Sequence, residues 1–131
     1  MPHEAEARQW IAFADRDLAL AEHTAKTMWP TPHEIVCYHC QQFAEKYLKA
    51  FLVSQGQEPP YIHDLAKLVA LCEAANPDFG QIKQQCIILT EYGVQPRYPG
   101  YYGNNRRGYG QGFALCHRHQ NIHAGKNTRI I

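Results

Sequence analysis

The chain has 131 residues, of which 45% are hydrophobic and 19% charged. This composition suits one globular domain and excludes wholesale disorder or a fibrous repeat. Its formal net charge of +1 favours neither a strongly acidic nor a strongly basic class of partner. Apolar runs reach at most five residues, whereas a membrane-spanning helix needs about 18, and the N-terminus lacks a signal-peptide pattern. We therefore expect a single domain over residues 1–131, in the cytoplasm and without a membrane partner.

The net charge conceals two unlike segments. Residues 1–92 contain all 12 acidic residues and 7 Lys or Arg, whereas residues 93–131 contain 6 Lys or Arg and no acid. Of the 9 glycines, 7 also follow residue 92. Residues 101–131 therefore form an atypical tail that is rich in glycine and basic.

Residues 4–28 predict an amphipathic first helix, because apolar side chains recur at steps of three and four without an internal Gly or Pro. Thr31 is suited to cap the following helix, and Pro32 to its first turn. We predict that second helix over residues 33–55, with Gly56 immediately after its end.

Residues 64–75 predict a third helix that is capped by His63 or Asp64, and residues 79–92 predict a fourth. Four helices joined by short loops, without an alternating strand pattern, predict an all-α fold: an antiparallel up-and-down helical bundle. Glycines and prolines then interrupt the chain, so that a fifth helix is only weakly patterned within residues 113–122.

The five cysteines form no zinc-binding or disulfide framework, so we expect free, mostly buried thiols. His33, Cys37 and Cys40 share one face of a helix but lack a fourth ligand at a convincing spacing. We therefore predict no metal and no cofactor.

Three motifs in order carry a family resemblance. Residues 38–52 read YHCQQFAEKYLKAFL, residues 63–65 read HDL, and residues 97–100 read RYPG. Together they resemble the HEPN domain family over about residues 8–100. The resemblance implies a bundle of about five helices, a homodimer, and a minimal nucleotidyltransferase as partner in a toxin–antitoxin-like pair. It also implies that RNA or a nucleotide is the ligand class.

Many HEPN domains are metal-independent ribonucleases that use an Arg followed, after four to six residues, by a His. Arg118 and His123 have this spacing here. A guanidinium stabilises the charge that develops on phosphorus, while an imidazole transfers the proton of the ribose 2′-hydroxyl. His119 and Gly125, however, stand where the family motif usually has a polar residue and a Tyr. Enzyme activity is therefore left open beside non-catalytic binding.

A second candidate site binds a nucleotide or a partner through polar residues of the second helix and of the RYPG loop. The alternatives are a solvated helix face and a loop anchored by an aromatic ring. The residues of this candidate site are His39, Gln41, Glu45, Lys46, Lys49, Arg97 and Tyr98.

The basic tail has three interpretations. Arg106, Arg107 and Tyr109 would suit an RNA-binding arm, since basic and aromatic side chains alternate with glycine. A loop would need no partner. In the third interpretation, residues 106–131 come from a shifted reading frame, because moving one nucleotide forward permits a segment with helical periodicity. The nucleotide sequence of the gene decides between the last interpretation and the others.

Overall fold

The computed structural model describes residues 2–90, and within that range every regular element is helical. The elements are α1 (Pro2–Thr27), α2 (His33–Ser54), α3 (Leu65–Ala75), the 3₁₀ helix η1 (Pro77–Ile82) and α4 (Lys83–Leu89). The prediction of an all-α helical bundle is confirmed. The predicted fifth helix and the tail lie outside the described residues.

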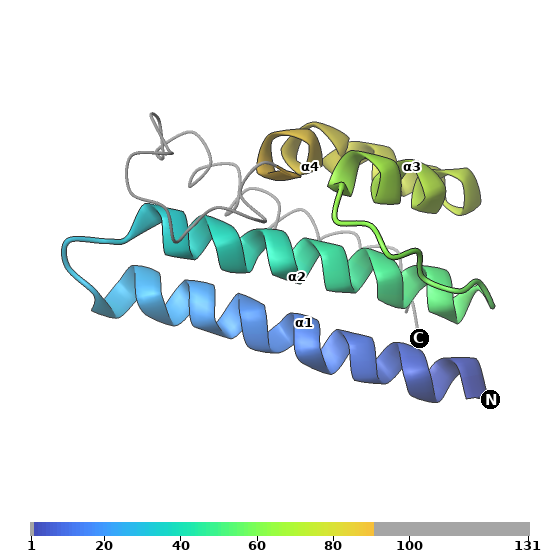
Figure 1. Ribbon diagram of the computed structural model, residues 1–131, viewed down its shortest axis with the longest axis horizontal. Coiled ribbons are helices and arrows are strands. Elements are labelled where there is room, and N and C mark those ends of the chain that lie inside the picture. The colour runs from blue at the N-terminus through green and yellow to red at the C-terminus, as the bar shows by residue number, and fades with distance from the viewer. Residues whose placement is uncertain (1, 91–131) are drawn as a thin grey trace.

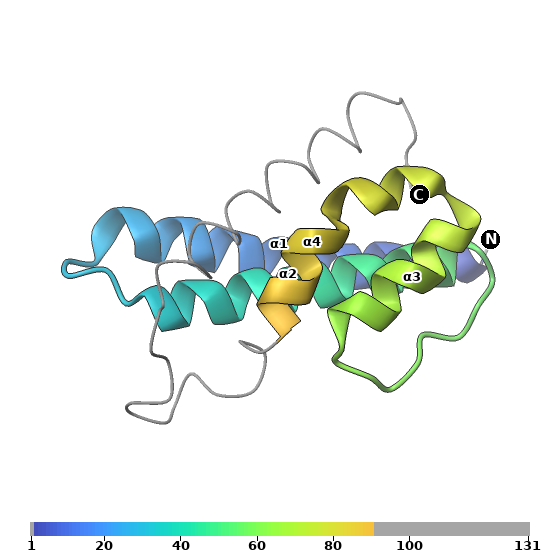
Figure 2. The same ribbon diagram turned by 90° about the horizontal axis from the view of Figure 1, so that it is seen from above.

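The helices are arranged in layers around α2 (Figure 1). α1 runs antiparallel to α2 along its whole length, whereas α3, η1 and α4 cover another face of α2. Viewed from above, α3 and the η1–α4 segment lie at an angle to each other and are joined near the C-terminal end of α2 (Figure 2). Among the described residues, no helix is both long and apolar enough to cross a membrane.

Small side chains let α1 approach α2 closely. Ala7, Ala14 and Ala21 are completely buried and stand seven residues apart, so they lie on one stripe of α1. Because alanine has only a methyl group, the backbones of the two helices can pack against each other with little between them. Bulkier residues of α2, such as Phe43 and Leu48, then fill the core.

α2 is the central helix of the described fold. Of its 22 residues, 14 are buried, which is more than a helix with a single buried face provides. It ends at Ser54 with Gln55 as its C-cap, and Gly56 follows as predicted, with a φ of 79° in the left-handed conformation that glycine adopts without strain. The amides of Gly56 and Gln57 donate to the carbonyls of Val53 and Leu52, which satisfies two groups at the helix end.

The prediction that Thr31 caps α2 is wrong. Pro32 occupies the N-cap position, and no side chain caps the helix there. The Thr31 hydroxyl instead lies 3.4 Å from the carbonyl oxygen of Met28, to which it donates. The carbonyl of Pro32 accepts from the amides of Ile35 and Val36, so the first turn closes without a side-chain acceptor.

The segment between α2 and α3 returns along α2 before α3 begins. The carbonyl oxygen of His63 therefore lies beside Gln41, near the middle of α2, and not at its end. α3 consequently runs in the same direction as α2, and the η1–α4 segment runs back. Of the two predicted caps, His63 and Asp64, it is Asp64 that caps α3, because its carboxylate accepts from the amides of Ala66 and Lys67.

The predicted fourth helix begins later than expected. Pro77–Ile82 is a 3₁₀ helix, and regular α-helix starts only at Lys83. The Asn76 side chain accepts from the Asp78 amide and so fixes a tight first turn. Gly80 passes so close to Glu73 that an added Cβ would lie 2.5 Å from its Oε2. Tight packing against α3 thus accompanies the narrower helix.

Candidate functional site

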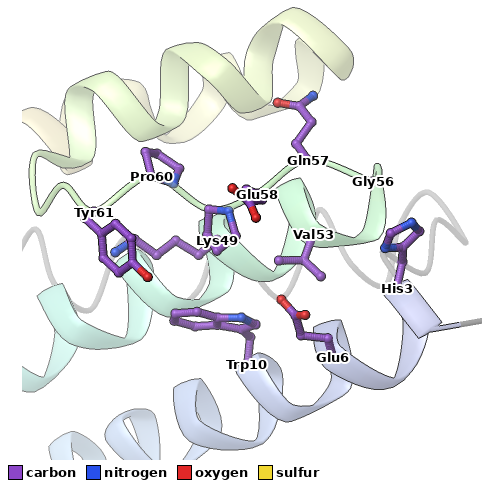
Figure 3. A pocket seen from close by; sticks show the side chains of 11 residues that line it. His3, Glu6, Trp10, Lys49, Val53, Gly56, Gln57, Glu58, Pro60 and Tyr61 are labelled. Atoms are coloured by element: carbon purple, nitrogen blue, oxygen red, sulfur yellow. The ribbon is translucent and has the colours of Figure 1, made fainter.

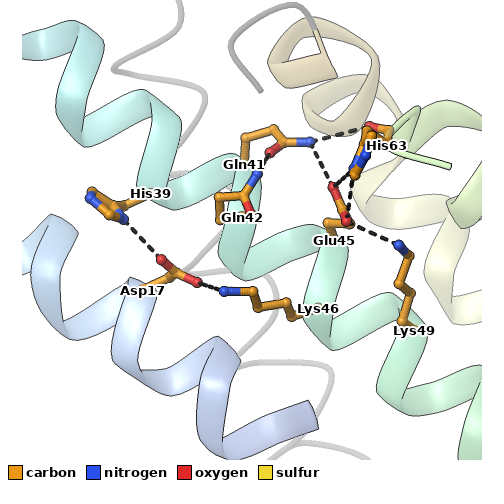
Figure 4. A network of polar contacts seen from close by, with 8 residues as sticks. All are labelled: Asp17, His39, Gln41, Gln42, Glu45, Lys46, Lys49 and His63. Atoms are coloured by element: carbon orange, nitrogen blue, oxygen red, sulfur yellow. Dashed lines mark hydrogen bonds and ion pairs between the residues drawn. The ribbon is translucent and has the colours of Figure 1, made fainter. Parts of the chain in front are cut away.

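The candidate site of the described residues is a line of polar side chains along α2 (Figure 4). It consists of two hydrogen-bonded groups. One joins α2 to α1, and the other joins α2 to the segment before α3. Five of its members are the residues predicted for nucleotide or partner binding on this helix: His39, Gln41, Glu45, Lys46 and Lys49.

Asp17 of α1 is the centre of the first group. Its Oδ1 lies 2.9 Å from His39 Nδ1, and its Oδ2 lies 2.6 Å from Lys46 Nζ. Burial raises the pKa of the Asp17 carboxyl, but hydrogen bonds from His39 and Lys46, and the positive charges of these groups, outweigh burial. The pKa of Asp17 is therefore lowered, and the carboxylate form is favoured in the folded protein.

Glu45 is the centre of the second group. Its Oε2 accepts from Lys49 Nζ at 3.0 Å, and both side chains are buried. His63 Nδ1 lies 3.0 Å from Oε1 of the same carboxylate. The Gln41 amide donates to the His63 carbonyl at 3.2 Å and itself accepts from Gln42 at 2.7 Å. This group therefore fastens the returning segment to the middle of α2.

The predicted site residues on α2 differ in how far they reach the surface. Gln41, Glu45 and Lys49 are buried and hydrogen-bonded within the protein. The side chains of His39 and Lys46 remain 22% and 28% exposed, respectively. Members of both groups join α2 to neighbouring elements, and His39 and Lys46 also reach solvent. With Nδ1 turned to Asp17, the His39 ring leaves Nε2 available as a hydrogen-bonding atom.

The two members of the network that lie outside α2, Asp17 and His63, are absent from the predicted site. Asp17 is the clearer omission, because it stands three residues after Ala14 and four before Ala21, on the buried stripe of α1. A carboxylate on such a stripe needs a partner on the facing helix, and that was the available signal. His63 was interpreted only as the start of α3, although its imidazole contacts Glu45.

Arg97, Tyr98, Arg118 and His123 lie outside the described residues. The proposed ribonuclease pair and the RYPG loop are therefore not placed relative to α2.

Cysteines of the described part are free and buried, as predicted. Burial raises the pKa of the thiols of Cys37, Cys72 and Cys86 to about 12, which makes them poor nucleophiles near neutral pH. Within residues 2–90, no group of three or more His, Cys, Asp or Glu side chains is arranged to hold a metal ion.

Comparison with known families gives one finding. The model of the HEPN domain family matches residues 7–115. This range includes most of α1 and all of α2, α3, η1 and α4. No curated protein and no solved structure matches the chain.

Proposed function

Because the chain belongs to the HEPN domain family, we propose that it is a homodimer that acts with a minimal nucleotidyltransferase in a toxin–antitoxin-like pair. RNA or a nucleotide is its ligand class in this proposal. The observation that carries it is the family match, which extends across residues 7–115. The polar network along α2 supports it, since the YHCQQFAEKYLKAFL motif supplies most of that network.

In its catalytic form, the proposal makes the protein a metal-independent endoribonuclease. Arg118 would stabilise the charge that develops on the phosphate, and His123 would transfer the proton of the 2′-hydroxyl. The 2′-oxygen would then attack phosphorus and displace the 5′-oxygen, which leaves a 2′,3′-cyclic phosphate and a 5′-hydroxyl.

Incubation of purified full-length protein with structured and unstructured RNA, with a chelator present, tests this chemistry. Cleavage is expected, and His123→Ala and Arg118→Ala are each expected to reduce its rate by at least about 100-fold. His23→Ala and Arg8→Ala are the matched controls, because both residues are exposed on α1. If the RNA stays intact, or if His123→Ala cuts as fast as the unsubstituted protein, the ribonuclease assignment is rejected.

Partnership has its own test. The mass of the purified protein in solution should equal two chains, and the gene beside its own should encode a small nucleotidyltransferase that co-purifies with it. A monomer at micromolar concentration contradicts the homodimer. A neighbouring gene of another class, or a nucleotidyltransferase that does not bind, contradicts the pairing.

The alternative is a non-catalytic nucleotide- or protein-binding module. Partial exposure of His39 and Lys46 favours it, because both reach solvent from the motif helix. In this alternative, Lys46→Gln weakens binding of a nucleoside triphosphate while Lys67→Gln, at an exposed lysine of α3, leaves it unchanged. Calorimetric titration measures both. Equal affinities of the two variants contradict a role of Lys46 in binding.

A further inference from the structure

A pocket of about 450 Å³ opens at the end of the molecule where α1 begins and α2 ends (Figure 3). Val53 and Lys49 of α2 form its buried side. Glu6 and Trp10 line it from α1, and Glu58 and Tyr61 line it from the segment after α2. Its volume lies in the range of pockets that hold small ligands. We call it the Trp10 pocket.

The charges around the Trp10 pocket favour a cation. Glu6 and Glu58 are exposed acids that have no basic partner among the described residues. Lys49 is the lysine in the lining, and its ammonium is already matched by the buried carboxylate of Glu45 at 3.0 Å. With His3 counted as neutral, Glu6 and Glu58 outnumber Lys49 in the lining, so the lining carries net negative charge, which attracts a basic group and repels a phosphate.

The aromatic rings narrow the choice of cation. Lys49 Nζ lies 5.9 Å from the centre of the Trp10 ring, so the indole already accepts a cation at its face. Figure 3 shows Trp10 between Glu6 and Tyr61, and the Tyr61 ring is fully exposed. A flat cation that stacks on a ring and also donates hydrogen bonds to carboxylates fits these groups better than a compact ammonium.

We propose that the Trp10 pocket binds the guanidinium group of an arginine side chain that belongs to a partner protein. The guanidinium stacks on the exposed ring of Tyr61, since Lys49 already lies over the Trp10 ring, and donates hydrogen bonds to the carboxylates of Glu6 and Glu58. The pocket is separate from the His39 and Lys46 surface and from the RNA chemistry proposed above. The docking of an arginine-bearing segment therefore holds or fails independently of the proposed ribonuclease activity.

Tryptophan fluorescence of the full chain tests this proposal. The protein has 2 tryptophans, and Trp29 is 91% exposed in the loop after α1, so Trp29→Phe leaves Trp10 as the sole indole with little structural cost. N-acetylarginine methylamide, a mimic of an arginine within a peptide, is titrated against this variant. We expect a saturable change in Trp10 emission that weakens as salt is added.

Three further ligands distinguish the source of binding. The citrulline analogue has the same shape without the charge and is expected to give no saturable change. The lysine analogue keeps the charge without the planar fork and is expected to bind more weakly. Guanosine presents a neutral aromatic base and is likewise expected to bind more weakly than the arginine mimic. Equal binding of citrulline, or tighter binding of lysine or guanosine, overturns the proposal.

Variants locate the site. Glu6→Gln and Glu58→Gln are each expected to weaken binding about threefold, and the two together about tenfold. Glu4→Gln is the matched control, since Glu4 is an exposed acid of α1 that does not line the pocket. Circular dichroism verifies that the variants remain helical. If Glu4→Gln weakens binding as much as Glu6→Gln, attraction is general to the acidic surface and the pocket is not the site.

Discussion

At the scale of single residues, the buried ion pair between Glu45 and Lys49 is the most consequential contact. Both side chains are withdrawn from water, so each depends on the other for compensation of its charge. His63 makes a second contact with Glu45, but its side chain is 72% exposed, so solvent weakens the stabilisation that this contact gives to the Glu45 carboxylate. Loss of Lys49 therefore leaves a buried carboxylate with only a partial partner.

We expect Lys49→Met to lower the free energy of unfolding by about 3 kcal/mol, because Glu45 then stays buried without its main partner. The double variant Glu45→Leu/Lys49→Met should lose much less, since both charges are removed together. Urea unfolding followed by circular dichroism measures the three proteins. Lys67→Met, at an exposed lysine, is the control and should change stability by less than about 0.5 kcal/mol. A single variant as stable as the control contradicts this interpretation.

The lowered pKa of Asp17 predicts a specific acid sensitivity. In the folded protein this pKa lies below its ordinary value of 3.8, because His39 and Lys46 stabilise the carboxylate despite burial. The stability that the Asp17 carboxylate contributes is therefore fully present above the pKa of Asp17 in the unfolded chain. It is lost as the pH falls through the lowered pKa of Asp17 in the folded protein. Unfolding followed between about pH 6 and pH 3 should show a steeper loss for the unsubstituted protein than for Asp17→Asn. If the free energy of unfolding falls with pH equally steeply in both proteins, Asp17 is not the source of the acid sensitivity.

At the scale of elements, two glycines test two different constraints. Gly56 has a φ of 79°, yet a Cβ there would meet its nearest atom, in His3, only at 3.8 Å. Gly56→Ala is therefore expected to cost about 1 kcal/mol through backbone strain alone. Gly80→Ala should cost less, because the contact is with the flexible end of Glu73, which can move away. Thermal unfolding ranks the two variants. The reverse order would show that packing against Glu73 is rigid.

The sequence predicted α1, α2 and α3 to within about two residues, because strong apolar periodicity and end signals coincide in each. It failed at the starts of two helices. Pro32, and not Thr31, holds the N-cap position of α2, where a backbone carbonyl closes the first turn, and the start of the fourth helix became 3₁₀ where Gly80 passes Glu73. Periodicity reports which face of a helix is buried, but it does not report how closely another element approaches.

The candidate site divides in the same way. The spacing of four residues between Glu45 and Lys49 indicates their ion pair from the sequence alone. The contacts with Asp17 and His63 could not be identified in this way, because these residues come from other elements. The Trp10 pocket could not be predicted either. It depends on the return of the segment after α2, which places Tyr61 near Trp10 although the two residues are 51 positions apart in the sequence.

At the scale of the whole molecule, the close packing of α1 on α2 depends on alanine. Ala14→Leu should lower the free energy of unfolding by about 1–3 kcal/mol, because the extra methyl and methylene groups force the two helices apart. Ala12→Leu, at an exposed position of the same helix, should be nearly neutral. Chemical denaturation compares the two. Equal stability would mean that the interface accepts a larger side chain.

The alanine stripe of α1 has a further consequence for alignment. Because Ala7, Ala14 and Ala21 repeat every seven residues, a slide of α1 by one repeat, about 10.5 Å, would offer α2 a similar row of methyl groups. Apolar packing alone distinguishes such offsets poorly. Asp17 resolves the ambiguity, since its carboxylate meets both His39 and Lys46 at only one offset. This single charge fixes the register of α1 on α2.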